Sequence, residues 1–407
     1  MKRLFVRLPP FLFLLLLLFP SCLFALEEIE KGGSFRLIGQ YAQNPSDTPT
    51  YPNGSDYRGD IVARQFLTAG IGESVWFDIN LHETFSYLKS ESPLSPLYSG
   101  VERSSALESN LFDDKYSKGE IALDRLNMRL SFERVDLTAG RQPINLATTF
   151  HFTPNDFFAP FSASTFYRVY KEGVDAVRGE VRINDLTQLS LIAVLGYEED
   201  SSSSTGWSSS MDEGRNSYLA RISTSLANFE WSILGGKVRR EKVVGGGMQG
   251  ELAEWLGIRG EGHYAIPDDS GKDDYAEIVI GLEHRFENDF FLRLEHFYHG
   301  KGEGDLDNYS LPIIELVDRG GYLAKRYSVL SGNYQFTPLL AGDVAYIINH
   351  VDNSSLIALN GVYSLSDESE LSAGLNLPMG DEPEGGVLKS EFGLMPTTIG
   401  LEYRIYY

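Results

Sequence analysis

Residues 75–87 read VWFDINLHETFSY, and apolar and polar side chains alternate along almost the whole segment. A period of two is typical of a β-strand with one apolar and one polar face. Only Glu83 interrupts the apolar face, which consists of Val75, Phe77, Ile79, Leu81, Phe85 and Tyr87. Soluble sandwiches and membrane barrels both contain such strands, so the connections between strands have to distinguish the two folds.

Similar segments recur along the chain, and short turns alternate with long polar loops between them. The pattern predicts eighteen strands, at 33–42, 60–70, 75–87, 119–133, 135–142, 174–183, 188–198, 216–227, 229–240, 243–254, 256–266, 275–286, 290–300, 326–336, 339–350, 355–365, 370–379 and 396–407. Short turns are expected at 70–74, 134, 184–187, 228, 287–289, 337–338 and 366–369. Longer loops are expected at 43–59, 89–118, 199–215, 301–325 and 380–395.

Short turns on one side and long loops on the other are typical of outer-membrane barrels. The last strand, TTIGLEYRIYY at 397–407, resembles the terminal strand of bacterial outer-membrane proteins, with Tyr407 where phenylalanine is more usual. We therefore predict an all-β fold, a transmembrane antiparallel up-and-down β-barrel of about 18 strands with 16 as the alternative count. Aromatic residues beside short turns would form its periplasmic girdle: Phe229, Trp231, Phe286, Phe290, Tyr334, Phe336, Tyr403 and Tyr407.

The N-terminus has the features of a secretory signal peptide. Basic residues precede an apolar run at 11–19, which is too short to cross a bilayer as a helix. We predict a signal peptide at 1–25 and the barrel at 26–407, with a lipoprotein anchored at Cys22 as the alternative. Cys22 is the single cysteine, so the mature barrel would have no disulfide or thiolate chemistry.

The charge of the chain is strongly acidic, with 35 basic and 57 acidic residues and a net charge of −22. Loss of the three basic residues of the signal peptide would make the net charge about −25. Such a surface argues against nucleic acid as a partner. Acidic clusters fall in the predicted loops, but no spacing matches an EF-hand, so we interpret them as a solvated rim and predict no metal or cofactor.

The long connection at residues 143–172 is rich in proline and aromatic residues. Pro143, Pro154 and Pro160 exclude a regular helix or central strand. Its many Phe and Tyr residues are too apolar for a solvated linker. We therefore expect this loop to be enclosed by the barrel and to constrict the lumen. The GGGMQG run at 245–250 lacks the lysine of a phosphate loop, and we interpret it as a flexible hairpin tip.

Charged residues fall on the predicted lumen face of several strands. Arg125 and Arg129 lie on one strand and Arg178 on another, and glutamates of the opposite sign share this face. Two interpretations remain open: paired charges that line a wet wall, and an arginine ladder that binds solutes. His284, His296 and Ser328 are expected to face lipid, which leaves an outer-membrane hydrolase as a further, less favoured alternative.

The region after residue 140 carries a family resemblance. Gly140-Arg141-Gln142, then PNDFF at 154–158, Arg168 and GVDAVR at 173–178 resemble a segment of porins related to the alginate-export barrels. The resemblance implies a channel for solutes or polysaccharides. The residues that it assigns to the narrowest part are Arg141, Arg168, Lys171, Asp175 and Arg178, to which the strand pattern adds Arg125 and Arg129.

Taken together, these features predict a porin of the bacterial outer membrane that passes small hydrophilic solutes or saccharides. Outer-membrane lipid and lipopolysaccharide are the expected neighbours. The alternative from another class is a structural or adhesive barrel with a sealed lumen.

Overall fold

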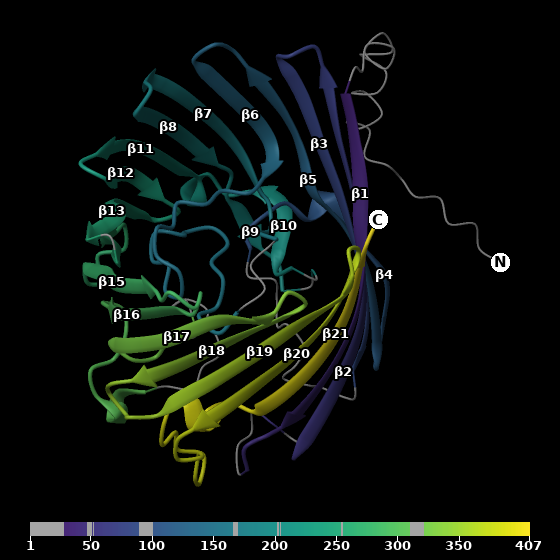
Figure 1. Ribbon diagram of the computed structural model, residues 1–407, viewed down its shortest axis with the longest axis vertical. Coiled ribbons are helices and arrows are strands. Elements are labelled where there is room, and N and C mark those ends of the chain that lie inside the picture. Colours follow the sequence, from purple (N-terminus) through teal and green to yellow (C-terminus); the bar gives the residue numbers. More distant parts are fainter. Residues whose placement is uncertain are drawn as a thin grey trace, which may run out of the picture.

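The protein forms a closed β-barrel (Figure 1). The computed structural model describes residues 28–46, 51, 53–88, 101–165, 170–201, 203, 205–253, 255–309 and 321–407. The predicted signal peptide and Arg168 lie outside the described residues. The main sheet has 19 strands, each antiparallel to its neighbours. One of them, β4, pairs only with the first residues of β5 and is not part of the ring, so eighteen strands form the barrel. The barrel closes where β1 pairs with β21.

The eighteen predicted strands each overlap one observed barrel strand, so the predicted fold class and strand number are confirmed. The barrel strands are β1 (Glu28–Gln43), β2 (Ser55–Ile71), β3 (Val75–Leu88), β5 (Ser117–Ser131), β6 (Val135–Gln142), β7 (Val174–Asn184), β8 (Thr187–Val194), β11 (Ser217–Leu226), β12 (Phe229–Val238), β13 (Glu241–Ala253), β14 (Leu256–Pro267), β15 (Tyr275–Arg285), β16 (Phe291–His299), β17 (Arg326–Thr337), β18 (Leu340–Asn349), β19 (Ser355–Ser366), β20 (Ser369–Met379) and β21 (Thr397–Tyr406). Smaller elements lie in the long loops: β4 (Glu108–Asp114), β9 (Tyr197–Glu199), β10 (Trp207–Met211), and the 3-10 turns η2 (Ser105–Leu107), η3 (Glu213–Arg215), η4 (Leu306–Asn308) and η5 (Phe392–Leu394).

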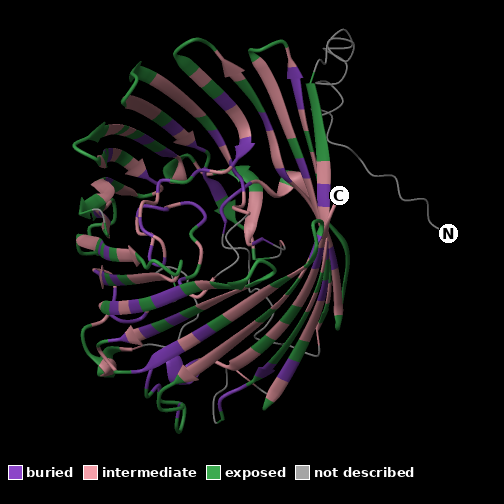
Figure 2. Cartoon of the chain, in the orientation of Figure 1, coloured by how far each residue is buried: buried purple, intermediate pink, exposed green. Residues whose placement is uncertain are grey.

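The barrel wall has an apolar outer face and a polar inner face. On β3, Ile79 is 39% and Phe85 36% exposed, whereas Asn80 between them is 3% exposed. Figure 2 shows exposed positions along the outside of the wall, interspersed with positions of intermediate burial and with buried ones. This arrangement is the reverse of a soluble sandwich, and it matches a barrel whose exterior meets hydrocarbon. None of the helices in the described part of the chain is long and apolar enough to cross a membrane.

Short turns and long loops lie at opposite ends of the barrel, as the sequence predicts. The turn between β11 and β12 contains only Ala227 and Asn228, both at positive φ (54° and 65°). Two such residues match the twist of a tight hairpin. The long connections lie at the other end, and we call it the loop end.

The GGGMQG run lies inside β13, so its interpretation as a flexible hairpin tip is wrong. A Cβ added to Gly247 would lie 2.5 Å from Oγ1 of Thr148. The carbonyl of Gly246 accepts a hydrogen bond of 2.9 Å from the side-chain amide of Asn155. Gly247 is therefore needed because the connection between β6 and β7 packs directly against this strand.

Candidate functional site

The connection between β6 and β7, which the structure describes at residues 143–165 and 170–173, folds inside the barrel, and we call these residues the inner loop. Its trace lies inside the ring of strands in Figure 1. The inner loop contacts wall residues that face the lumen. On β16, Leu294 and His296 point outward and are exposed, whereas Glu295 between them is fully buried. The contacts of Glu295 with the inner loop therefore confirm that the loop occupies the lumen.

Two buried wall carboxylates bind the backbone of the inner loop. Glu261 on β14 accepts hydrogen bonds from the backbone N–H groups of Thr148, Thr149 (3.0 Å) and Asn155 (3.1 Å). The N–H groups of an irregular loop have no strand partner, and burying them without acceptors would be costly. Glu261 therefore supplies the hydrogen-bond acceptors that a neighbouring strand provides for N–H groups within a β-sheet.

Glu295 does the same for the next three residues. It accepts from the N–H groups of Phe150 (2.7 Å), His151 (2.8 Å) and Phe152 (3.1 Å). Hydrogen bonds to a charged acceptor each contribute about 1.5–3 kcal/mol. The two glutamates thus fix the centre of the inner loop against one wall of the lumen.

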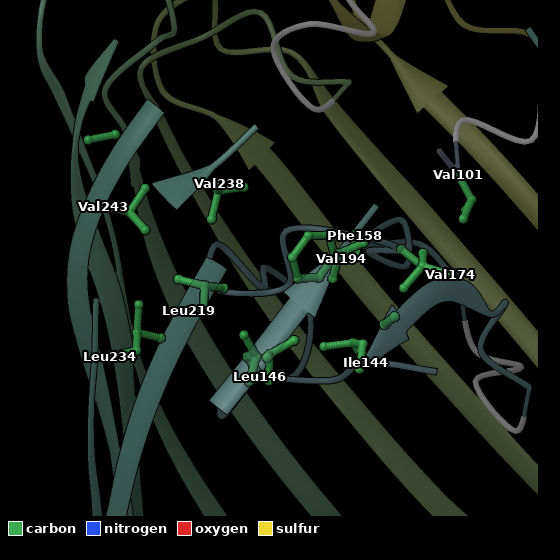
Figure 3. Close-up of a cluster of buried hydrophobic side chains, with 14 residues drawn as sticks. Val101, Ile144, Leu146, Phe158, Val174, Val194, Leu219, Leu234, Val238 and Val243 are labelled. Atoms are coloured by element: carbon green, nitrogen blue, oxygen red, sulfur yellow. The ribbon is translucent and has the colours of Figure 1, made fainter. Parts of the chain in front are cut away.

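Apolar contacts complete this attachment. Ile144, Leu146 and Phe158 of the inner loop belong to one buried cluster with Leu219 and Leu234 of the wall (Figure 3). These wall residues face inward, where an open lumen would leave them in water. Burying them explains why the inner loop is rich in large apolar residues.

The inner loop also reaches the opposite part of the wall through its returning segment. The ring of Tyr170 lies 3.4 Å from the guanidinium carbon of Arg64 on β2 and 4.9 Å from that of Arg125 on β5. Its hydroxyl donates to Asp124. Lys171 donates to Asp156 and, at 2.9 Å, to the carbonyl of Ala159. The inner loop therefore contacts two sides of the lumen and narrows it.

Arg141 and Asp175, two of the residues expected in the constriction, form a buried ion pair with each other. Nε and Nη2 of Arg141 donate to the two carboxylate oxygens of Asp175 at 2.9 and 3.0 Å. Arg141 is 1% exposed, and Nη2 also donates to the carbonyl of Ser104. Asp175 accepts further bonds from the Ser104 N–H and the Tyr197 hydroxyl. The Arg141 side chain is enclosed in this arrangement and that of Asp175 is largely so. A solute-binding role for the two residues stays a prediction.

The other expected residues are spread around the inner loop. Lys171 is held by its bonds within the inner loop, and Arg125 donates to the carbonyl of Lys171. Arg129 and Arg178 face the lumen. Both pair in register with Thr138 of the strand between them, so the two arginines lie at the same height in the barrel wall. Nε of Arg178 is 3.5 Å from a carboxylate oxygen of Glu180.

The sequence patterns gave no sign that Glu261 and Glu295 hold the inner loop. Glu295 is recognisable from alternation as a lumen-facing charge, but alternation does not identify its partner. Its partners are backbone N–H groups of residues 150–152, more than 140 positions away. Arg221 also faces the lumen, between the outward-pointing Ala220 and Ile222, and we add it to the candidate residues.

No family model matches the chain, and no curated protein matches its sequence. Solved structures do match over nearly the whole length. Acinetobacter baumannii OccAB3 gives a TM-score of 0.58 at 11% identity, covering 93% of this chain and 99% of the other. Pseudomonas aeruginosa OccK9 (OpdG) gives 0.61 at 8% identity, covering 94% and 98%. A BenF-like porin from Pseudomonas fluorescens Pf-5 gives 0.58 at 11% identity, also covering 94% and 98%.

Identities this low establish the fold and nothing finer. The fold is that of bacterial outer-membrane porins. The coarse part of the predicted resemblance, a porin barrel, is supported, whereas these structures give no specific support to the alginate-export group.

Proposed function

We propose that the protein is a porin of the bacterial outer membrane that lets small hydrophilic solutes diffuse passively through its lumen. The closed wall of eighteen strands supports this, because a barrel of this width leaves an aqueous channel unless something fills it. The observation that carries the proposal is the attachment of the inner loop by Glu261 and Glu295. A loop fixed in this way narrows the channel and gives it a rigid lining.

The charges of the wall favour anions among these solutes. On one side of the barrel the arginines are paired, as Arg36 and Arg404 are with Glu402. Among the described residues, no carboxylate forms an ion pair with Arg129 or Arg221. Unpaired positive charge on a wall raises the local concentration of anions. Carboxylate-bearing solutes, including acidic saccharides such as uronates, are therefore the proposed class.

The proposal is tested by recording ion currents through the mature chain in planar bilayers, under a salt gradient. We expect stepwise channels with a reversal potential that indicates a preference for anions. The double variant Arg129→Gln/Arg221→Gln should reduce the anion-to-cation permeability ratio by about twofold, because two unpaired lumen charges are lost. Arg285→Gln changes an exposed arginine beside a short turn and serves as the matched control.

The two parts of the proposal fail separately in this experiment. Channels that prefer cations would contradict the anion assignment and leave the porin assignment intact. A folded protein that gives no channels would contradict the porin assignment. It would favour the structural or adhesive barrel, in which the inner loop seals the lumen.

A further inference from the structure

A cluster of polar side chains lies on the outer face of the barrel, where lipid is expected. Oγ of Ser328 on β17 lies 2.9 Å from Nδ1 of His296 on β16 and 2.8 Å from Nε2 of His350, which directly follows β18. The register pairs His296 with Ser328 across the two strands. Three segments therefore bring their polar groups to one point, which we call the outer cluster.

The outer cluster faces away from the lumen. Leu294 and Leu330, the next residues on the same face of β16 and β17, are 45% and 46% exposed. Arg326, which lies on the same face of β17, is exposed as well. Among the described residues, no carboxylate lies within ion-pair distance of Arg326. Polar groups that face lipid are expensive, so such a cluster requires a partner.

The position along the strands matches the level of lipid headgroups. Strand β16 ends three residues after His296, and Arg326 is the first residue of β17. Both positions are at the loop end of the barrel. Tyr298, which pairs with Arg326 in register, supplies an aromatic residue of the kind found at a membrane interface.

A catalytic role for Ser328 does not fit the surroundings. A serine nucleophile requires N–H groups placed to stabilise the oxyanion. Strands β16 and β17 are each paired with neighbours on both edges, so their backbone N–H groups are engaged in the sheet. His284, the other histidine considered for hydrolysis, lies at the opposite end of the barrel, where its ring contacts Trp255 and Phe286.

We propose that the outer cluster binds the phosphate of an outer-leaflet glycolipid through Arg326, His296, His350 and the Ser328 hydroxyl. A phosphate offers several acceptor oxygens and a negative charge, which match a guanidinium and a group of ring N–H and O–H donors. The inference rests on the proposed function only for the orientation of the barrel in the outer membrane, in which the loop end faces outside the cell.

The test is native mass spectrometry of the purified mature chain with diphosphoryl lipid A as the probe. We expect the double variant His296→Gln/Arg326→Gln to bind this lipid about tenfold more weakly, because the guanidinium and one imidazole are lost. Ser328→Ala should weaken binding less. His284→Gln, which changes a lipid-facing histidine at the opposite end, should bind like the unmodified protein. A heat-dependent shift in gel mobility checks that each variant is folded.

Additional arms of the experiment identify the source of the phosphate and the outcomes that would overturn the proposal. Dephosphorylated lipid A should bind weakly, and inorganic phosphate alone should not compete. Equal binding of the dephosphorylated lipid, or full competition by inorganic phosphate, would contradict the assignment. The assignment would also be contradicted if the protein released fatty acid from the lipid and Ser328→Ala abolished this release. It would be contradicted as well if the variants dissociated an oligomer and left lipid binding unchanged. A barrel that conducts no ions but binds this lipid would contradict the channel and leave the outer cluster assigned.

Discussion

A single buried ion pair joins the two strands from which the inner loop leaves and to which it returns. Arg141 is the penultimate residue of β6, and Asp175 is the second residue of β7. The sequence resemblance identified both residues as important but placed them against solute. It could not show their contact with Ser104, because residues of another loop pack here only in the folded barrel. The preceding Gly140, at a φ of 116°, lets the backbone of β6 lie close to Leu126 and Asn127 of β5, where a side chain would not fit.

We expect Asp175→Asn to destabilise the barrel by up to about 3–5 kcal/mol, because it removes the carboxylate that accepts two hydrogen bonds from the buried Arg141 and leaves this guanidinium only Glu108, at 3.6 Å, as a charge partner. Urea unfolding of the detergent-folded protein measures this change. Asp289→Asn, which breaks an ion pair whose side chains are both 69% exposed, should change the free energy of unfolding by less than about 1 kcal/mol. An equally small effect of Asp175→Asn would show that the pair is not structural.

At the scale of elements, alternation was enough to predict the strands, whereas the loops depended on contacts between distant parts of the chain. The short strands of the long loops were not predicted as separate elements: β9 and β10 pair only with each other, and β4 pairs only with the first residues of β5. The glycine run of β13 was misread because the close approach of the inner loop to Gly247, and of neighbouring strands to the other glycines, has no local pattern. Loops can also carry buried charge, as Glu391 beside η5 shows.

Glu391 ties the loop at 380–396 to the strand ends. It accepts hydrogen bonds from the Leu323 N–H (3.2 Å), the Asn349 side chain (2.7 Å) and the Tyr327 hydroxyl. Burial raises the pKa of Glu391 to about 7, against the effect of these donors. A raised pKa in the folded state means that the stabilisation is complete below the ordinary glutamate pKa and is lost as the pH rises through about 7.

We therefore expect hydrogen exchange in residues 380–396 to become faster between pH 5 and pH 8, beyond its intrinsic pH dependence. Glu391→Gln should remove this additional change, because the amide stays neutral. Glu384→Gln, at an exposed position of the same loop, should retain it. The prediction fails if Glu391→Gln shows the same pH dependence as the unmodified chain.

At the scale of the whole molecule, the barrel wall has an apolar outer surface and a polar inner surface. Its strand number, closure and outer apolar face followed from alternation and loop lengths, because these depend on local sequence. The inward fold of the inner loop was expected from its aromatic content. What fixes it there was not predictable, because the carboxylates of Glu261 and Glu295 meet backbone groups that carry no sequence signal.

The most direct test of a fixed inner loop is a disulfide between Thr148→Cys and Gly247→Cys in the mature chain. A Cβ at Gly247 would lie 3.2 Å from that of Thr148, so a shift of a few tenths of an ångström brings the pair to the about 3.5–4.5 Å of a disulfide. The single-channel conductance of this variant is measured before and after oxidation. The same measurement is made after adding Glu261→Gln and Glu295→Gln, with Glu370→Gln, a lumen residue paired with Arg404, as control.

We expect the disulfide to form readily and to leave the conductance of the otherwise unmodified channel unchanged. The Glu261→Gln/Glu295→Gln background should conduct more and with larger fluctuations when reduced. Oxidation should return it to the original level, and Glu370→Gln should behave like the unmodified channel. Failure of the disulfide to form, or an equal conductance with and without the two glutamates in the reduced state, would contradict an inner loop held in the lumen by these residues.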